Sequence, residues 1–196
     1  MDKKIRCSWC GDSEIYVNYH DLEWGRPVHD DQKLFEMLIL ESMQAGLSWI
    51  TVLKKRDGYR EEFDYFDINK IANYDQEKLE QLKNSDKIIK NKLKIESAVT
   101  NAKAFLSIQE RYGSFDKMIW SYVDGVAVDN KRISVDELPS ATPLSEQISK
   151  DLKKMGFKFM GATTVYAFMQ AIGMINDHIK DCFVYQALEN KDKNHC

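Results

Sequence analysis

The spacing of apolar residues predicts a chain built almost entirely of helices. The strongest pattern lies between Lys33 and Arg56, where apolar residues recur every three or four positions, as on one face of a helix. Gly46 suits the position that follows a helix, and Ser48 suits the N-cap of a second helix that begins at Trp49. We therefore expect two helices joined by a short turn, with Trp49 close to the end of the first helix.

Shorter patterns of the same kind follow, separated by polar residues or glycine. Asp30 or Asp31 is expected to cap the helix described above. Residues 124–143 are the one long irregular stretch, with a short extended piece expected at 126–128. The other expected helices comprise 59–66, 68–74, 76–84, 90–112, 115–123, 145–155 and 162–173, the last of them apolar on nearly every side. These patterns predict an all-α fold.

Glu41 interrupts the apolar face of the first helix. It follows Leu34 and Leu38 at helical spacing, so its carboxylate is expected among apolar side chains. Burial of an ionised carboxylate is costly unless the group is paired, protonated or in contact with a ligand. A structural ion pair is one explanation. The other is a pocket for a flat, cationic or amine-bearing ring, with Trp49 as its aromatic face.

Length and composition are those of an ordinary globular protein. The chain has 196 residues, 43% hydrophobic and 30% charged, and can bury a core without disulfides. We expect one domain of two lobes at residues 1–186 and a polar, frayed tail at 187–196. No apolar run approaches the roughly 20 residues that span a bilayer, and residues 1–10 lack the apolar core of a signal peptide. A cytoplasmic monomer with no membrane contact is therefore expected.

The net charge of −3 excludes a uniformly basic nucleic-acid binder, but it does not decide about DNA, because a local patch is enough to bind phosphate. Lys87, Lys90, Lys92 and Lys94 lie near the start of the long helix, where free backbone N–H groups also favour an anion. The alternative is a solvated, lysine-rich surface. The chain has no glycine-rich phosphate loop and no G-x-S-x-G motif, which argues against nucleotide-cofactor enzymes and serine hydrolases.

Aromatic residues are concentrated near the N-terminus. Trp9, Tyr16, Tyr19 and Trp24 occur within a segment that also carries cysteine and histidine. This density suggests one wall of a functional site. The alternative is an aromatic cluster that packs under the first long helix.

Cysteine and histidine residues occur at both ends of the chain and suggest a metal site. His178 and Cys182 are four residues apart, so on a helix their side chains would point the same way. With Cys7 and His20 they could form a tetrahedral site that holds the two ends together, and a closed site of this kind is structural. A site that uses Cys10 in place of His20 is an alternative, and a redox pair of Cys7 and Cys10 is another.

Four segments together resemble the bacterial 3-methyladenine DNA glycosylase I family of the helix-hairpin-helix glycosylase superfamily. The resemblance covers about residues 6–185. Its motifs are YHDLEWG at 19–25, LFEMLILESMQAGLSWITVLKKR at 34–56, LKKMGFKFMGATTVYAFMQAIG at 152–173 and NDH at 176–178. It implies an all-α, two-lobed helix-hairpin-helix architecture.

The resemblance also implies roles for individual residues. It places one structural zinc ion on Cys7, His20, His178 and Cys182 and leaves Cys10 outside the site. Base recognition falls on Glu41, Tyr19 and Trp49, with Trp9 and Tyr16 completing the aromatic wall. The loop that enters the gap left by the extruded base falls on Gln44–Leu47, including Gly46, with Leu47 as the wedge.

Two features depart from the wider superfamily. Related members often have glycine in the hairpin where this chain has Lys87, so side chains of Lys87, Lys90 or Lys92 could replace backbone contacts to phosphate. Most superfamily members use a catalytic aspartate that this family is thought to lack, so none is assigned.

The implied activity is hydrolytic excision of 3-methyladenine from double-stranded alkylated DNA, which starts base excision repair. The enzyme would be monofunctional, without lyase activity. The competing hypothesis is a zinc-bearing module that binds damaged DNA without catalysis. The combination of Glu41, Tyr19 and Trp49 favours the enzyme, since a module that reads only the DNA backbone needs no such pocket.

Overall fold

The structure, a computed structural model, describes residues 4–193, and helices dominate it. Helices account for 63% of it and strands for 2%, which confirms the all-α prediction. The α-helices are α1 (Glu14–Leu22), α2 (Asp31–Gln44), α3 (Trp49–Leu53), α4 (Arg56–Glu62), α5 (Ile68–Ala72), α6 (Gln76–Asn84), α7 (Lys92–Tyr112), α8 (Phe115–Trp120), α9 (Pro143–Lys154), α10 (Ala162–Ala171) and α11 (Phe183–Lys193). Short 3-10 turns are η1 (Ser8–Cys10), η2 (Asp64–Phe66), η3 (Ser121–Val123) and η4 (Val135–Glu137).

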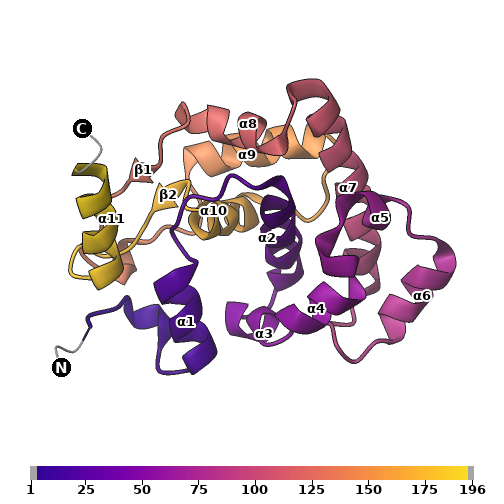
Figure 1. The fold of residues 1–196 in the computed structure, drawn as a ribbon, viewed down its shortest axis with the longest axis horizontal. Coiled ribbons are helices and arrows are strands. Elements are labelled where there is room, and N and C mark those ends of the chain that lie inside the picture. The colour runs from indigo at the N-terminus through magenta and orange to yellow at the C-terminus, as the bar shows by residue number, and fades with distance from the viewer. Residues whose placement is uncertain (1–3, 194–196) are drawn as a thin grey trace.

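Helix α2 is the central element. It contacts α3, α7, α8 and α10, and Figure 1 shows it beside α10 in the middle of the molecule. All residues from Leu34 to Met43 are buried, so the helix is enclosed on every side. Asp30 is its N-cap and accepts a hydrogen bond from the Lys33 backbone N–H at 2.8 Å. Asp31 instead accepts hydrogen bonds from two backbone N–H groups of α8 and so links the two helices.

The turn between α2 and α3 follows the predicted course. Ala45 ends α2, Gly46 has a φ of 81°, and Ser48 precedes α3. The Ser48 hydroxyl bonds the side chain of Thr51 at 2.8 Å and makes no cap bond to the backbone. Trp49 therefore lies one short turn beyond the end of α2.

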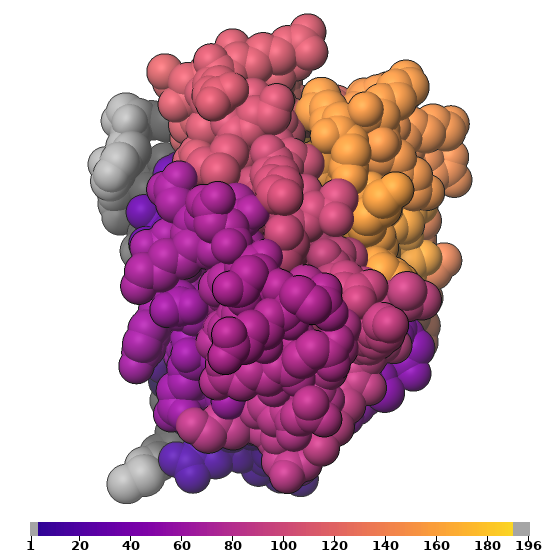
Figure 2. Space-filling view, turned by 90° about the vertical axis from the view of Figure 1, so that its right-hand side faces the viewer, coloured from indigo at the N-terminus to yellow at the C-terminus, as the bar shows by residue number. Residues whose placement is uncertain are grey.

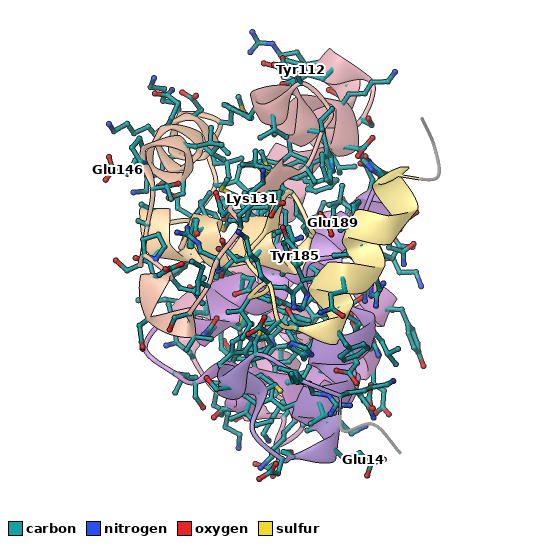
Figure 3. All side chains as sticks on the ribbon, turned by 90° about the vertical axis from the view of Figure 1, so that its left-hand side faces the viewer. Glu14, Tyr112, Lys131, Glu146, Tyr185 and Glu189 are labelled. Atoms are coloured by element: carbon teal, nitrogen blue, oxygen red, sulfur yellow. The ribbon has the colours of Figure 1, made fainter. Side chains whose placement is uncertain are left out.

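The two ends of the chain lie side by side. Figure 1 shows α1 and α11 on the same side of the molecule, and the backbone N–H of Phe183 donates to the carbonyl of Ile5 at 3.0 Å. Figure 3 views this side, with Tyr185 on α11. The Tyr185 hydroxyl donates to Asp129 at 2.9 Å. This side of the fold thus combines segments from the beginning, the middle and the end of the chain.

The opposite side is formed by the middle of the chain. Helices α5, α6 and α8 pack against α7, the longest helix. Figure 2 shows that α4 to α7 cover most of this face, with α9 beside them at its upper edge. Helix α9 packs against α10, which returns the chain to the centre.

The irregular stretch and the tail differ from their predictions. Residues 124–143 contain β1 (Val128–Asp129), which pairs in parallel with an unpredicted strand, β2 (Ile175–Asn176). A strand of two residues has no periodicity that a sequence pattern could reveal. Helix α11 continues to Lys193, so the polar tail predicted from residue 187 begins within a helix. Lysine and glutamate are good helix formers, so a charged segment can extend a helix whose first turns are anchored. Residues 194–196 lie outside the described residues.

Among residues 4–193, no helix combines the length and the apolar character needed to cross a membrane.

Candidate active site and metal centre

A cavity of about 370 Å³ lies next to the end of α2. This volume lies within the range of roughly 300–1,000 Å³ that is typical of small-molecule sites. All five residues predicted to recognise a ring line it. The full lining consists of Trp9, Tyr16, Tyr19, Trp24, Glu41, Gln44, Trp49, Val135, Leu138, Ala167 and Gln170.

Glu41 is the charged residue of this cavity. Its side chain is 3% exposed, and none of the described residues forms a hydrogen bond with its Oε2 atom. Burial without a partner raises the pKa of Glu41 to about 8. Glu36, on the same helix, is also buried but pairs with Arg60 at 2.8 Å and Lys33 at 3.0 Å. The structural ion pair considered for Glu41 is thus found at Glu36.

Aromatic rings form the wall that faces the carboxylate. The Trp9 ring centroid lies 5.1 Å from that of Tyr16 and 4.8 Å from that of Trp24, and the Tyr19 and Trp49 centroids are 5.3 Å apart. Burial, followed by the charge of Glu41, raises the pKa of Tyr19 well above its ordinary value, so its hydroxyl stays neutral. The buried indole N–H groups of Trp9 and Trp49 have no partner among the described residues. The cavity thus combines aromatic faces with two indole N–H groups and a carboxylate oxygen that have no partner among the described residues.

Sequence reasoning missed the wall opposite the aromatic cluster. Val135 and Leu138 come from the stretch predicted to be an irregular surface loop, and Ala167 and Gln170 come from α10, which was predicted to be core. Gln170 carried the one usable signal, because it is a long polar side chain in an apolar helix. The loop residues carried none, since their position depends on contacts distant in sequence.

Two cysteines and two histidines from the ends of the chain meet in the interior. Cys7, His20, His178 and Cys182 are buried, and their candidate ligand atoms all lie within 4.8 Å of one another. The Cys182 Sγ atom is 3.5 Å from His20 Nε2 and 3.6 Å from His178 Nδ1, and the Cys7 Sγ atom is also 3.6 Å from His178 Nδ1. Tetrahedral zinc with bonds of about 2.3 Å to sulfur and 2.0–2.1 Å to nitrogen separates these atoms by roughly 3.6 Å. The four residues therefore fit one metal ion.

The outer contacts of the two histidines support this fit. His20 Nδ1 lies 2.8 Å from Asp21 Oδ1, and His178 Nε2 lies 3.1 Å from the carbonyl oxygen of Trp24. Each acceptor holds a proton on the outer ring nitrogen, so the inner nitrogen presents a lone pair to the cysteines. Arg6 in turn binds Asp21 at 2.8 Å. This pairing of imidazole with carboxylate or carbonyl is typical of metal-binding histidines.

Two details of the metal hypothesis change. Cys10 is buried but lies outside the group, which disfavours the site that replaces His20 with Cys10. Cys7 and Cys10 are both free thiols, so no disulfide joins them. The prediction that His178 and Cys182 share a helix is wrong, because α11 starts only at Phe183. A turn, closed by the Cys182 N–H and the Ile179 carbonyl at 2.8 Å, brings the two side chains together.

The turn after α2 lies at the edge of the cavity. Gln44 lines both this cavity and a smaller neighbour of about 200 Å³, which Gly46 and Leu47 also line. Leu47 is 42% exposed. Thr163 and Thr164, from the first turn of α10, also line the smaller cavity. Their position beside the turn was not predicted from the sequence. An exposed apolar side chain therefore stands beside the candidate pocket.

The lysines near the start of α7 have different environments. Lys87 pairs with Glu61 and Lys90 pairs with Asp86, each at 2.6 Å, whereas Lys92 is exposed in the first turn of the helix. Lys94 is not a surface residue as expected: it is buried and donates to the carbonyls of Met43 and Ala45 at 2.8 and 2.6 Å. Lys94 thereby fixes the start of α7 against the turn that carries Leu47.

Comparison with known proteins agrees with this geometry. A model of the methyladenine glycosylase family matches residues 9–185. The DNA-3-methyladenine glycosylase of Haemophilus influenzae is 46% identical over 177 residues, which cover 90% of this chain and 96% of the relative. DNA-3-methyladenine glycosylase 1 of Escherichia coli is 44% identical over 180 residues, which cover 92% of this chain and 96% of the relative.

Solved structures agree over a similar length. The 3-methyladenine DNA glycosylase I of Staphylococcus aureus, described for its recognition of 3-methyladenine, matches with a TM-score of 0.89 and 39% identity, covering 92% of this chain and 96% of that one. A point variant of a 3-methyladenine DNA glycosylase I in complex with 3-methyladenine matches with a TM-score of 0.90 and 38% identity, covering 92% and 97%. The chain belongs to the methyladenine glycosylase family.

Proposed function

We propose that this protein is a DNA repair glycosylase that hydrolyses the N-glycosyl bond of 3-methyladenine in alkylated double-stranded DNA. The observation that carries the proposal is Glu41, a buried carboxylate whose Oε2 atom has no partner in the described part of the chain, in a cavity lined by aromatic rings. The relatives named above are glycosylases of the same substrate. The cavity supplies what this substrate needs.

The substrate brings its own activation. Methylation at N3 gives adenine a positive charge, so the base leaves as a neutral molecule and no enzyme group has to protonate it. The bond to the sugar breaks as electrons move to the base, and water adds to C1′ of the oxocarbenium-like sugar while losing a proton. Among residues 4–193, none of those that line the cavity is a lysine, so they place no amine there to form the Schiff base that a lyase requires.

The pocket favours the cationic base over ordinary adenine. A cation beside Glu41 stabilises the ionised carboxylate, which burial otherwise disfavours. Stacking of a cationic ring on Trp49 or Trp9 adds roughly 0.5–2 kcal/mol. A neutral base receives neither contribution in full. Removal of the base from the duplex costs a few kcal/mol, and these contacts offset that cost for the damaged base.

The DNA would bind across the turn that carries Leu47. In this proposal, Leu47 enters the gap left by the extruded base, and the Gln44–Leu47 turn lies against the duplex. The free backbone N–H groups at the start of α10 flank this turn, and a helix N-terminus is suited to binding phosphate. Helices α9 and α10 with their connecting turn would act as the helix-hairpin-helix, in place of the segment around Lys87 to which the resemblance assigned the hairpin. Lys92, and Lys87 and Lys90 after exchange of their surface partners, would contact the backbone.

Cys7, His20, His178 and Cys182 would hold one structural zinc ion. The ion would lack an open coordination position and take no part in bond cleavage. Two of its ligands lie next to residues of the pocket. His20 directly follows Tyr19 in the sequence. His178 contacts the carbonyl of Trp24, whose ring lines the cavity. The metal would therefore support the aromatic wall.

Measurement of the bases released from methylated duplex DNA tests the proposal. The protein should release 3-methyladenine, and Glu41→Gln should reduce the rate ten- to hundredfold, because a hydrogen bond to a charged group contributes roughly 1.5–3 kcal/mol. Glu36→Gln is the matched control, since this buried glutamate lies on the same helix but has ion-pair partners. Its rate should stay near that of the unmodified protein.

The same experiment separates the enzyme from the competing module. Release of no base by a folded protein that binds methylated DNA would favour a non-catalytic module that recognises damage. A rate in Glu41→Gln equal to that of the unmodified protein would contradict the role of the carboxylate, whatever the reaction.

A further inference from the structure

A buried carboxylate behind the cavity determines how one of the cavity residues is oriented. Asp177 is 1% exposed and accepts four hydrogen bonds. The donors are Asn130 Nδ2 at 2.8 Å, Arg132 Nε at 3.0 Å, the Tyr166 hydroxyl at 2.5 Å and Gln170 Nε2 at 2.8 Å. The contact with Arg132 is also an ion pair. Of its four partners, Gln170 alone lines the cavity.

The hydrogen bond to Asp177 decides which end of the Gln170 amide faces the cavity. The NH₂ group of Gln170 donates to Asp177 Oδ2 at 2.8 Å, so this end of the amide is occupied. The carbonyl Oε1 is then the free end, and none of the described residues donates to it. The cavity thus has two acceptors, the Gln170 carbonyl and the Glu41 carboxylate, on separate helices.

We infer that Gln170 is a specificity-determining residue for the excised base and that Asp177 is its positioning residue. The inference rests on the proposed function. Adenine carries an exocyclic amine, which donates, where guanine carries a carbonyl oxygen, which accepts. A fixed acceptor at Gln170 therefore binds 3-methyladenine and repels 3-methylguanine, and a polar group that the base covers but leaves unpaired discriminates strongly.

Release of both bases from methylated duplex DNA tests this inference. Gln170→Met keeps the length of the side chain and removes the acceptor. Release of 3-methyladenine should fall about tenfold while release of 3-methylguanine stays constant or rises, so that the ratio of the two rates falls about tenfold. Gln147→Met is the matched control, because Gln147 also donates to an aspartate, Asp151 at 2.7 Å, but is exposed on α9. Its ratio should equal that of the unmodified protein.

A second pair of variants tests the role of Asp177. Asp177→Asn can donate a hydrogen bond and so lets the Gln170 amide rotate, and the ratio should fall as in Gln170→Met. Tyr166→Phe removes one donor but leaves the carboxylate, so the ratio should be retained. A change of stability alone would lower both rates in parallel and leave the ratio constant.

The outcomes separate this inference from the function on which it rests. Equal losses for both bases in Gln170→Met, or no loss for either, would overturn the specificity role while leaving the glycosylase function intact. A folded Asp177→Asn with an unchanged ratio would overturn the positioning role. If Asp177→Asn does not fold, as judged by circular dichroism, Gln170→Met decides alone. An unmodified protein that releases no 3-methyladenine would overturn both the function and the inference.

Discussion

Glu36 and Glu41 show how the same side chain serves two purposes within one helix. Both are buried on α2, but Glu36 pairs with Arg60 and Lys33 whereas Glu41 Oε2 has no partner among the described residues. The apolar stripe of the sequence identified Glu41, because Leu34 and Leu38 precede it at helical spacing. Glu36 drew no attention, since its partners depend on the fold. A buried charge alone thus does not distinguish a site from an ion pair, whereas its partners do.

The raised pKa of Glu41 predicts how stability depends on pH. Because the folded-state pKa of about 8 exceeds the usual value of 4.5, the folded protein holds a proton that the unfolded chain releases between these pH values. The contribution of Glu41 to stability is complete below pH 4.5 and is lost as pH rises through 8. Glu41→Gln lacks this titration. The free energy of unfolding of Glu41→Gln, minus that of the unmodified protein, should therefore be about 3 kcal/mol larger at pH 8 than at pH 5. Urea unfolding at the two pH values measures this difference.

Glu36→Gln is the control for that measurement, since it removes a buried carboxylate that has cationic partners. It should not stabilise the protein at pH 8. An equal effect of Glu41→Gln at both pH values would mean that Glu41 stays ionised throughout, and the explanation by burial would fail.

At the scale of elements, the turn from Ala45 to Ser48 connects the pocket to the surface. Gly46 has a φ of 81°, which favours glycine, and Leu47 projects beside the cavity. Leu47→Ala should reduce base release from duplex DNA about tenfold, because an apolar wedge worth roughly 1.5–3 kcal/mol on burial is lost. Binding of free 3-methyladenine, followed by tryptophan fluorescence, should not change.

An exposed leucine elsewhere provides the comparison for this prediction. Leu22, at the end of α1, is 68% exposed and lines neither cavity at the turn, so Leu22→Ala should leave base release unchanged. Weaker binding of the free base in Leu47→Ala would mean that the side chain shapes the pocket and is not a wedge.

The sequence predicted most helices, but not α1 or α11, and it predicted their contacts poorly. The cap at Asp30 could be predicted because a cap is a local hydrogen bond between residues three apart. Val135 and Leu138 could not be placed in the cavity, because their position depends on a loop tied through Arg132 to Asp177, 45 residues further along the chain. Local signals reveal elements, whereas the second wall of a site depends on contacts between distant segments.

At the scale of the whole molecule, the first and last segments meet at the cysteine and histidine cluster. Cys7 and His20 come from one end of the chain, and His178 and Cys182 come from the other. Nearby, the backbone N–H of Phe183 donates a hydrogen bond to the carbonyl of Ile5. A metal ion bound by these residues would favour the folded state, because the unfolded chain does not bring them together. The central packing of α2 with α10 does not involve this cluster. A metal ion at this cluster should therefore affect the terminal segments and the aromatic wall more than the core.

Removal of the metal tests this division. Cys182→Ser should lose the metal, as measured by elemental analysis, and its melting temperature should fall by several degrees because binding free energy that favours the folded state is lost. Affinity for free 3-methyladenine should fall by about tenfold, because the Trp24 ring lines the cavity and its carbonyl is held by His178. Cys10→Ser should retain the metal, since Cys10 lies outside the cluster. Loss of metal in Cys10→Ser would mean that Cys10 is one of the ligands. Retained affinity in metal-free Cys182→Ser would show instead that the packing of Trp9, Trp24 and Tyr19 maintains the aromatic wall without the ion.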